Sequence, residues 1–144
     1  MAAGPRCCRT RSTVAVAHLV SVARIVTRCR GSGWQLSRPL RSGHRPTITR
    51  AEGFADHPIL TGVELPFTSN VSLYQTQPAA PTATCLPLGT IPDQEPEPVA
   101  WTNTYGDCRV FYTSLGHPDD FQAASFRRLL VNAIFWALDR ERNT

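Results

Sequence analysis

Near the C-terminus, hydrophobic residues recur at intervals of three and four positions, which is the spacing of one face of an α-helix. The stretch "SFRRLLVNAIFWALDRER" begins with Ser125, a residue type that favours a helix N-cap. We therefore predict a helix from about Ser125 to Asp139 that packs its apolar face on a sheet. The apolar face consists of Phe126, Leu129, Leu130, Ala133, Ile134, Ala137 and Leu138, and the polar face of Arg127, Arg128, Asn132 and Arg140.

The stretch before this helix has the pattern of two strands joined by a tight turn. In "PVAWTNTYGDCRVFYTSLG", apolar and β-branched residues flank "YGD" at residues 105–107 on both sides. Glycine beside aspartate is typical of a hairpin turn. The second run, Arg109 to Leu115, is dense in Val, Phe, Tyr and Thr, and it predicts a strand in the interior of a sheet.

Prolines divide the middle of the chain into short segments. Pro78, Pro81 and Pro87 exclude a long helix there. The stretch "TATCLPLG" predicts a strand, and Pro87 within it indicates an edge position or a bulge. The stretch "IPDQEPEP" is an acidic loop, and "HPILTGVELPF" predicts a loop with a short helical turn.

Charge divides the chain into two parts. Residues 1–51 contain ten arginines and no acidic residue, whereas residues 52–144 contain five arginines and eleven acidic residues. The arginines are scattered among Ser, Thr, Gly and Pro, and lysine is absent, which argues against specific nucleic-acid binding. Residues 31–46 are rich in turn residues and lack apolar periodicity. We therefore expect a disordered leader over residues 1–47 and organised structure from about Ile48.

Two interpretations of the leader stay open. Its arginine-rich, acid-free composition is that of an organellar presequence. The alternative is a disordered or misread segment without a function of its own. The apolar run near the N-terminus is broken by His18 and Arg24, so it is too short and too charged to span a membrane. We expect a cytoplasmic protein unless the leader is a targeting segment.

The cysteines indicate neither a disulfide framework nor a structural zinc site. Cys7, Cys8, Cys29, Cys85 and Cys108 are odd in number and include no CxxC pair. No Gly-x-Cys-x-Gly or Gly-x-Ser-x-Gly elbow occurs, which argues against a glutaminase of the Cys-His-Glu type. A phosphate-binding glycine loop is also absent. The sequence therefore identifies no cofactor, and it leaves metal binding open.

The segment "EPVAWTNTYGDCRVFYTSLGHPDDFQAASFRRLLVNAIFWAL" resembles the C-terminal part of the ThuA-like, or trehalose-utilisation, domain. The upstream "HPILTGV", "SLY" and "PVAW" follow the order of that family, so the resemblance covers about residues 48–140. The family belongs to the class I glutamine amidotransferase-like superfamily. The resemblance implies an α/β fold, namely the C-terminal half of a flavodoxin-like domain. The glycine-rich strand-to-helix turn of the family's first half has no counterpart here, and "SGHRPT" around His44 matches it poorly.

His117 lies in the "LGH" motif that the resemblance places in the family's site. It follows a predicted strand and precedes a helix, which is where open α/β sheets bind ligands. An imidazole there can bind a metal or transfer a proton near pH 7. The alternative is that Gly116 and Pro118 make a turn that His117 only completes.

Asp119, Asp120 and Tyr74 are further candidates. The two aspartates either orient the histidine and accept sugar hydroxyls or merely favour the first turn of a helix. We assign Asp119, with His117, to a catalytic role. We assign Asp120 and Tyr74 to substrate binding, Tyr74 by stacking on a sugar ring. The alternative for Tyr74 is a place in the core. His57, in "DHPI", is expected to be either a ligand or a structural turn residue.

Three hypotheses of function follow. The first is a ThuA-like domain related to the use of trehalose or a sugar derivative, inactive as an isolated fragment because the leading strands are missing. The second is a noncatalytic module that docks on a partner through an exposed sheet edge, which also favours self-association. The third is a degenerate or misread product without activity.

Overall fold

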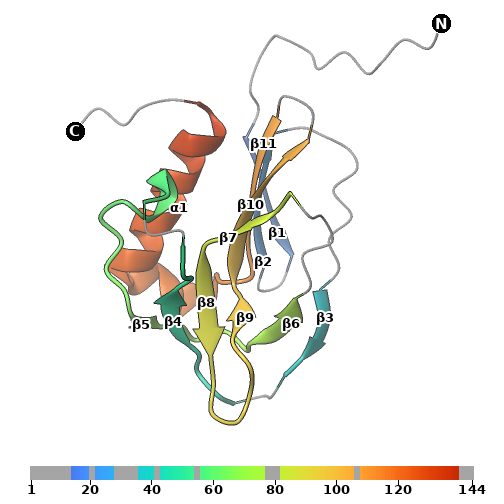
Figure 1. The fold of residues 1–144 in the computed structure, drawn as a ribbon, viewed down its shortest axis with the longest axis vertical. Helices are drawn as coiled ribbons and strands as arrows, with labels where there is room; N and C mark the ends of the chain where they lie inside the picture. Colours follow the sequence, from blue (N-terminus) through green and yellow to red (C-terminus); the bar gives the residue numbers. More distant parts are fainter. Residues whose placement is uncertain are drawn as a thin grey trace, which may run out of the picture.

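Short strands, two 3-10 turns and one α-helix make up the described parts of the chain in the computed structural model. The described residues are 14–19, 22–27, 36–40, 43–53, 56–76, 82–105 and 108–139. Strands and helix together give an α/β fold, as predicted. The helix, α1, lies to one side of the strands (Figure 1).

The largest sheet has five strands, and each neighbouring pair is antiparallel. In spatial order the strands are β1 (Val14–Leu19), β2 (Val22–Thr27), β11 (Cys108–Thr113), β10 (Ala100–Tyr105) and β7 (Thr84–Cys85). β10 and β11 pair with each other as the predicted hairpin requires, and Tyr105 pairs with Cys108. β11 lies between β2 and β10, so it is an interior strand, as its Val, Phe and Tyr content predicts.

A smaller sheet and a separate strand pair extend the structure, and their neighbouring strands are also antiparallel. The smaller sheet has the order β5 (Phe67–Thr68), β4 (Thr47–Arg50), β8 (Pro87–Thr90) and β9 (Glu97–Pro98), and the pair consists of β3 (Leu36–Pro39) and β6 (Tyr74–Thr76). In the stretch "IPDQEPEP", which we predicted as a loop, residues 91–96 connect β8 to β9, whereas Glu97 and Pro98 form β9.

The strand predicted around Pro87 is divided at Leu86. β7 ends at Cys85 in the large sheet, and β8 begins at Pro87 in the small one. Leu86 links the two sheets, because its N–H donates to the Ala100 carbonyl at 3.0 Å and its carbonyl accepts from the Ala51 N–H at 2.9 Å. Pro87 occupies the first position of β8, where a missing N–H is tolerated. β8 lies between β4 and β9, so the predicted edge position is wrong for this strand.

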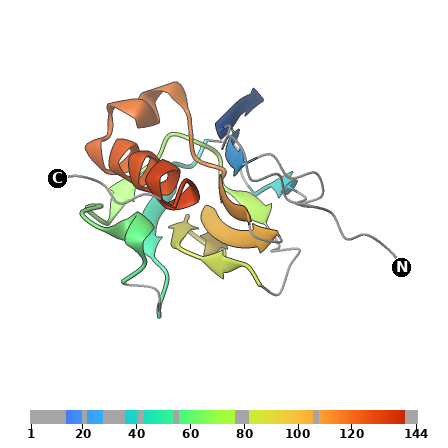
Figure 2. The same cartoon turned by 90° about the horizontal axis from the view of Figure 1, so that it is seen from above.

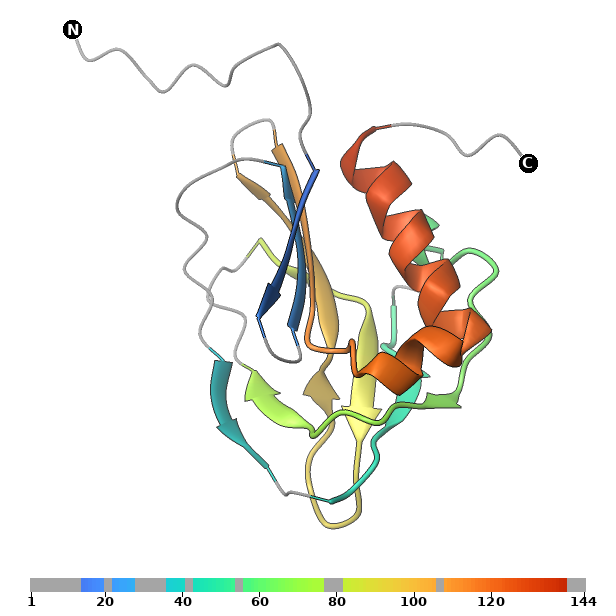
Figure 3. The ribbon, with the colours of Figure 1, turned by 180° about the vertical axis from the view of Figure 1, so that it is seen from behind.

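α1 spans Ala124–Ala137 and contacts β11 and β2 on one side of the large sheet (Figure 2 and Figure 3). Its N-cap is Ala123, which makes no side-chain capping hydrogen bond, so the predicted cap at Ser125 is wrong. Ala123 also ends the preceding 3-10 turn, and its N–H donates to the Asp120 carbonyl at 3.0 Å. The turn therefore sets the start of the helix, and a capping serine is not needed.

The buried face of the helix is close to the predicted one. Phe126 and Ala137 are buried, as predicted, and Leu129 and Ala133 are buried beside them. Two further predicted core residues, Leu130 and Ile134, are half-buried and pack against the core from its border.

Asn132, which we predicted on the polar face of α1, is buried. Its Nδ2 donates to the carbonyl oxygens of Ile59 and Thr61, at 2.9 and 2.8 Å. These two residues lie in and just after η1 (Pro58–Leu60), the short helical turn predicted after His57. A buried amide needs hydrogen-bond partners, and this turn supplies them. Asn132 thus attaches η1 to the helix.

The core lies between α1, β11 and the smaller sheet. It includes Ile48, Ile59, Leu60, Leu73, Leu86, Val99, Phe111, Leu115, Phe126 and Leu129. Gly89 allows β8 to approach this core closely, because a Cβ at that position would lie 2.7 Å from a methyl group of Leu73 and 2.7 Å from one of Val99. Only glycine fits there without displacing the core.

Residues 1–47 include β1, β2 and β3. The division of the chain into a disordered leader and an organised part from about Ile48 stays a prediction. β1 and β2 form a hairpin, and β2 pairs with β11 from Ala23 to Val26. The Val and Ile content of these segments favours extended backbone, although charge and composition alone indicated disorder. The rest of the leader lies outside the described residues, apart from short stretches beside β3 and β4.

The pairing of β2 also changes the position of the sheet edges. We expected an exposed edge beside the C-terminal strands, but β2 occupies the free side of β11, and the outer strands of this sheet are β1 and β7. Self-association through an edge stays a prediction. Among the described residues, no helix is long and apolar enough to cross a membrane.

Candidate functional site

The segment after β11 is held tightly as it leaves the sheet. The Thr113 hydroxyl donates to the Val99 carbonyl at 2.9 Å and accepts from the Leu115 N–H at 3.1 Å. Gly116 is buried and has a φ of 137°, in the region that favours glycine. The chain then turns into η2 (Pro118–Gln122), with His117 at its N-cap. His117 is therefore placed by a fixed strand end.

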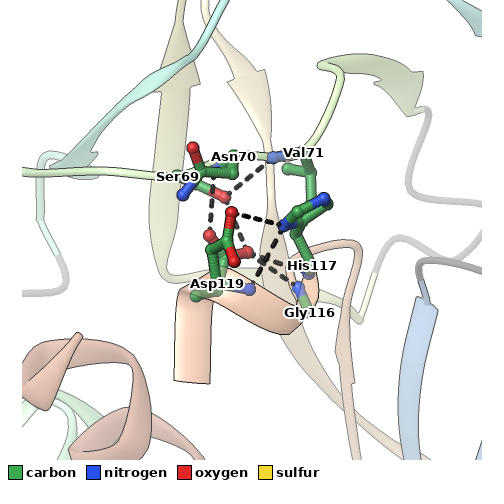
Figure 4. Close-up of polar contacts among 7 residues, drawn as sticks. Ser69, Asn70, Val71, Gly116, His117 and Asp119 are labelled. Atoms are coloured by element: carbon green, nitrogen blue, oxygen red, sulfur yellow. Dashed lines mark hydrogen bonds and ion pairs between the residues drawn. The ribbon is translucent and has the colours of Figure 1, made fainter. Parts of the chain in front are cut away.

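The His117 ring caps η2 through one nitrogen. Nδ1 accepts a hydrogen bond from the Asp119 N–H at 3.2 Å, and it lies 3.5 Å from Oδ2 of Asp119 (Figure 4). Pro118 occupies the first turn, where its missing N–H has no cost. The side chains of His117 and Asp119 are 41% and 67% exposed. Both side chains thus have solvent access.

Asp120 is the anchor of this turn. Asp120 is 2% exposed, and its carboxylate accepts hydrogen bonds from two segments that lie far apart in sequence. From one segment, the Ser69 hydroxyl and the Asn70 N–H donate at 2.8 Å each. From the other, the N–H groups of Gly116 and His117 donate at 3.1 Å each. The carboxylate therefore fastens the loop after β5 to the turn after β11.

The Asp120 geometry bears on the role that we predicted for this residue. Four donors within the chain already use its carboxylate, and burial keeps it from solvent. We therefore treat Asp120 as a positioning residue, which sets the backbone of His117. The substrate-binding role that we predicted for Asp120 stays a prediction.

Tyr74 is half-buried on β6, three residues beyond Val71 at the end of the anchored loop. Among the described residues, no hydrogen bond or ring contact joins it to the group around His117. Its predicted stacking on a sugar ring stays a prediction.

His57 lies at the other end of α1 from His117. Its Nδ1 accepts from the Ile59 N–H at 3.2 Å, so it caps η1, and its ring lies 5.6 Å from the ring of Trp136. Trp136 is near the last residue of α1, whereas η2 leads into the first. The helix length between them is about 18 Å at 1.5 Å per residue. The two histidines do not form one site.

Arg109 and Trp136 form the surroundings of His57. The Arg109 guanidinium donates to the Trp136 carbonyl at 3.0 Å, lies 5.3 Å from the Trp136 ring centroid and pairs with Asp139 at 2.8 Å. A cation at this end of a helix is favoured by the helix dipole. Burial, and then the charge of Arg109, lower the pKa of His57 below its ordinary value. These contacts describe a structural role for His57.

The described residues offer little nucleophilic or metal-binding chemistry. Cys85 is half-buried, and burial raises the pKa of its thiol, which lowers the thiolate fraction that a nucleophile needs. Trp101 and Tyr112 stack at 4.2 Å in the buried part of the sheet. In the part of the chain that the structure places, no group of three His, Cys, Asp or Glu side chains could hold a metal ion.

Comparison with known families identifies the class of the domain. A model of the ThuA family, described as trehalose utilisation, matches residues 33–137. The match covers well over half of the chain, and the chain therefore belongs to the ThuA family. The matched region begins at residue 33, whereas we expected organised sequence to start at about Ile48. No significant match occurs among curated proteins or among solved structures.

Sequence reasoning missed the Ser69 and Asn70 loop as part of this region. No local signal marks it, because these residues are about 50 positions from Asp120. The role of Asp120 had a signal, since Asp120 lies three residues after the N-cap His117, the position from which a carboxylate reaches back to the backbone N–H of the N-cap residue. No sequence signal apart from its position in the helix indicated that Asn132 binds the turn after His57.

Proposed function

We propose that this ThuA-family chain binds trehalose or a related sugar derivative at the turn after β11, with His117 and Asp119 as the contacting side chains. The observation that carries the proposal is the position of His117. It is a partly exposed histidine, held in one orientation, at the end of an interior strand. The family match supplies the ligand class, since its description is trehalose utilisation.

The two side chains have complementary chemistry toward a sugar. A carboxylate such as that of Asp119 accepts hydrogen bonds from hydroxyl groups, and an imidazole donates or accepts them. Asp120 fixes the His117 backbone, and the Asp119 N–H fixes the ring. A group that is held before binding loses little conformational freedom when it contacts a ligand.

We further propose that the described strands correspond to the C-terminal part of a flavodoxin-like domain, and that the chain alone has no turnover. Sites of this kind are assembled from several strand ends. The sequence lacks the glycine-rich strand-to-helix turn that would face His117 in that arrangement. Positioning of reacting groups accounts for about 7–11 kcal/mol of a rate enhancement, so an incomplete site keeps little of it.

The proposal is tested by titrating the full chain with trehalose, and separately with glucose, while backbone amide signals are followed by NMR. We expect shifts centred on residues 116–120. His117→Ala should weaken binding by about tenfold or more, the effect of losing one or two hydrogen bonds. His44→Ala is the matched control, because His44 is an exposed histidine elsewhere in the fold. Absence of shifts, or equal binding by both variants, would contradict the proposal.

A further inference from the structure

The two ring nitrogens of His117 have different surroundings. Nδ1 faces the backbone N–H of Asp119 at 3.2 Å. A backbone N–H can only donate, so Nδ1 must accept with its lone pair. In a neutral imidazole, one nitrogen accepts and the other carries the proton. The proton of the neutral His117 ring is therefore on Nε2.

We infer that His117 presents an Nε2–H donor to an oxygen atom of its ligand, such as a hydroxyl or carbonyl oxygen, and does not bind a metal through Nε2. The identity of the ligand rests on the proposed function above. The position of the proton does not, because it follows from the hydrogen bond to Asp119 alone. The position of this proton distinguishes a histidine that donates a hydrogen bond through Nε2 from one that binds a metal there.

The Asp119 carboxylate does not reverse this assignment. Its Oδ2 lies 3.5 Å from Nδ1, beyond the usual length of an N–H···O hydrogen bond, whereas the Asp119 N–H is closer. If the ring becomes protonated, Nδ1 and Nε2 both carry hydrogen, and Nε2 still donates. Only the Nδ1–H tautomer frees the Nε2 lone pair, and it would direct that proton at the Asp119 N–H.

Metal-binding histidines usually have the opposite arrangement. Their second nitrogen donates to a carboxylate, a carbonyl or water, which leaves the first nitrogen free to bind the ion. At His117 the nitrogen that would have to donate is Nδ1, and its nearest partner, the Asp119 N–H, is itself a donor. The absence of a three-ligand group among the placed residues agrees with this.

The tautomer is measured by long-range ¹H–¹⁵N NMR of the imidazole rings in the full chain, at a pH where the ring is neutral. We expect Nε2 of His117 to be protonated and Nδ1 to be unprotonated. Asp119→Ala removes the carboxylate but keeps the backbone N–H, so it should keep this pattern. A protonated Nδ1 with a bare Nε2 in the wild-type chain would overturn the inference, with or without a known ligand.

Two substitutions at His117 distinguish the capping role of Nδ1 from the donor role of Nε2. His117→Asn retains an acceptor near the position of Nδ1, and asparagine is a good N-cap, but it lacks the distal donor. His117→Gln supplies a distal amide N–H. With trehalose as the probe, we expect His117→Asn to bind about tenfold more weakly than the wild type at unchanged thermal stability, and His117→Gln to recover part of the loss. Equal trehalose binding by His117→Asn and the wild type would overturn the donor role.

Zinc chloride is the second probe. We expect the wild-type chain and His117→Asn to show the same zinc uptake by calorimetry. Stoichiometric zinc binding that shifts Nε2 of His117 and disappears in His117→Asn would overturn the inference. A wild-type chain that bound neither trehalose nor glucose would instead overturn the proposed function, and the nitrogen spectrum would still decide the position of the proton.

Discussion

Two turns in this protein contain the same dipeptide, and they differ in the residues that surround the histidine. His57-Pro58 and His117-Pro118 each begin a 3-10 turn with proline in its first position. In each turn the histidine is the N-cap, and its Nδ1 accepts from the N–H two residues later at 3.2 Å. The local hydrogen bonds are therefore the same.

The surroundings of the two histidines differ. The His57 ring lies against Trp136, and burial and the charge of Arg109 lower its pKa. The third residue of its turn is Leu60, which packs in the core. The third residue of the His117 turn is Asp120, whose carboxylate accepts hydrogen bonds from the His117 N–H and from the Ser69 hydroxyl.

In both His-Pro turns the histidine caps the 3-10 turn, whatever other role it has. A nitrogen of the ring is used by the turn in both places, so the dipeptide by itself does not identify a functional histidine. Whether such a histidine can contact a ligand depends on Nε2, and the exposure of Nε2 depends on tertiary packing. At His117 the side chain is 41% exposed, whereas the His57 ring packs on the end of the helix.

The largest effect is expected from Asp120→Ala. This substitution leaves the Ser69 hydroxyl and three backbone N–H groups without their acceptor. Each unsatisfied buried donor costs about 1–3 kcal/mol, and water relieves part of the loss, so we expect the free energy of unfolding to fall by about 3–5 kcal/mol. Urea denaturation measures it. A loss below about 1 kcal/mol would show that the carboxylate does not anchor the turn.

A smaller effect is expected at the other turn. His57→Ala removes the cap of η1 and the contact with Trp136, which should lower the free energy of unfolding by about 1–2 kcal/mol. His57→Asn keeps a capping acceptor and should recover part of this loss. If both variants were as stable as the wild type, the structural role of His57 would be refuted.

The pH dependence of stability should report on the surroundings of His57. The pKa of His57 is lowered in the folded chain, chiefly by burial and then by Arg109, so the unfolded chain takes up the proton first as pH falls. The stabilisation is fully present above about pH 6.5, the ordinary histidine value, and is lost as pH falls from there toward the folded-state pKa. Urea denaturation at pH 7.5 and 5.5 should show a smaller loss for His57→Asn than for the wild type. Equal losses would contradict the shift.

The accuracy of the sequence-based predictions depended on the range of the interactions involved. The pairing of β10 with β11, the interior position of β11 and the helix follow from local patterns, and the structure confirms them. The distant partners of Asn132 and Asp120 were not predicted, because they lie about 50 to 70 residues away in the sequence. The pairing of β2 with β11 was missed for the same reason. His117 was located correctly at a strand end, but its ring orientation depends on a hydrogen bond that no spacing rule specifies.

The smallest effect is expected from Asp119→Ala, and it completes the comparison of the two neighbouring aspartates. Asp119 is 67% exposed and makes one long ion pair, at 3.5 Å, with a histidine that is 41% exposed. Exposed pairs of this kind contribute at most a fraction of a kcal/mol, because solvent screens them and the side chains lose freedom. We expect the free energy of unfolding to change by less than about 0.5 kcal/mol, while trehalose binding weakens. A stability loss as large as that of Asp120→Ala would mean that the two carboxylates act together in the anchor. Unchanged binding would remove Asp119 from the proposed site and leave His117 as its single polar contact from this turn.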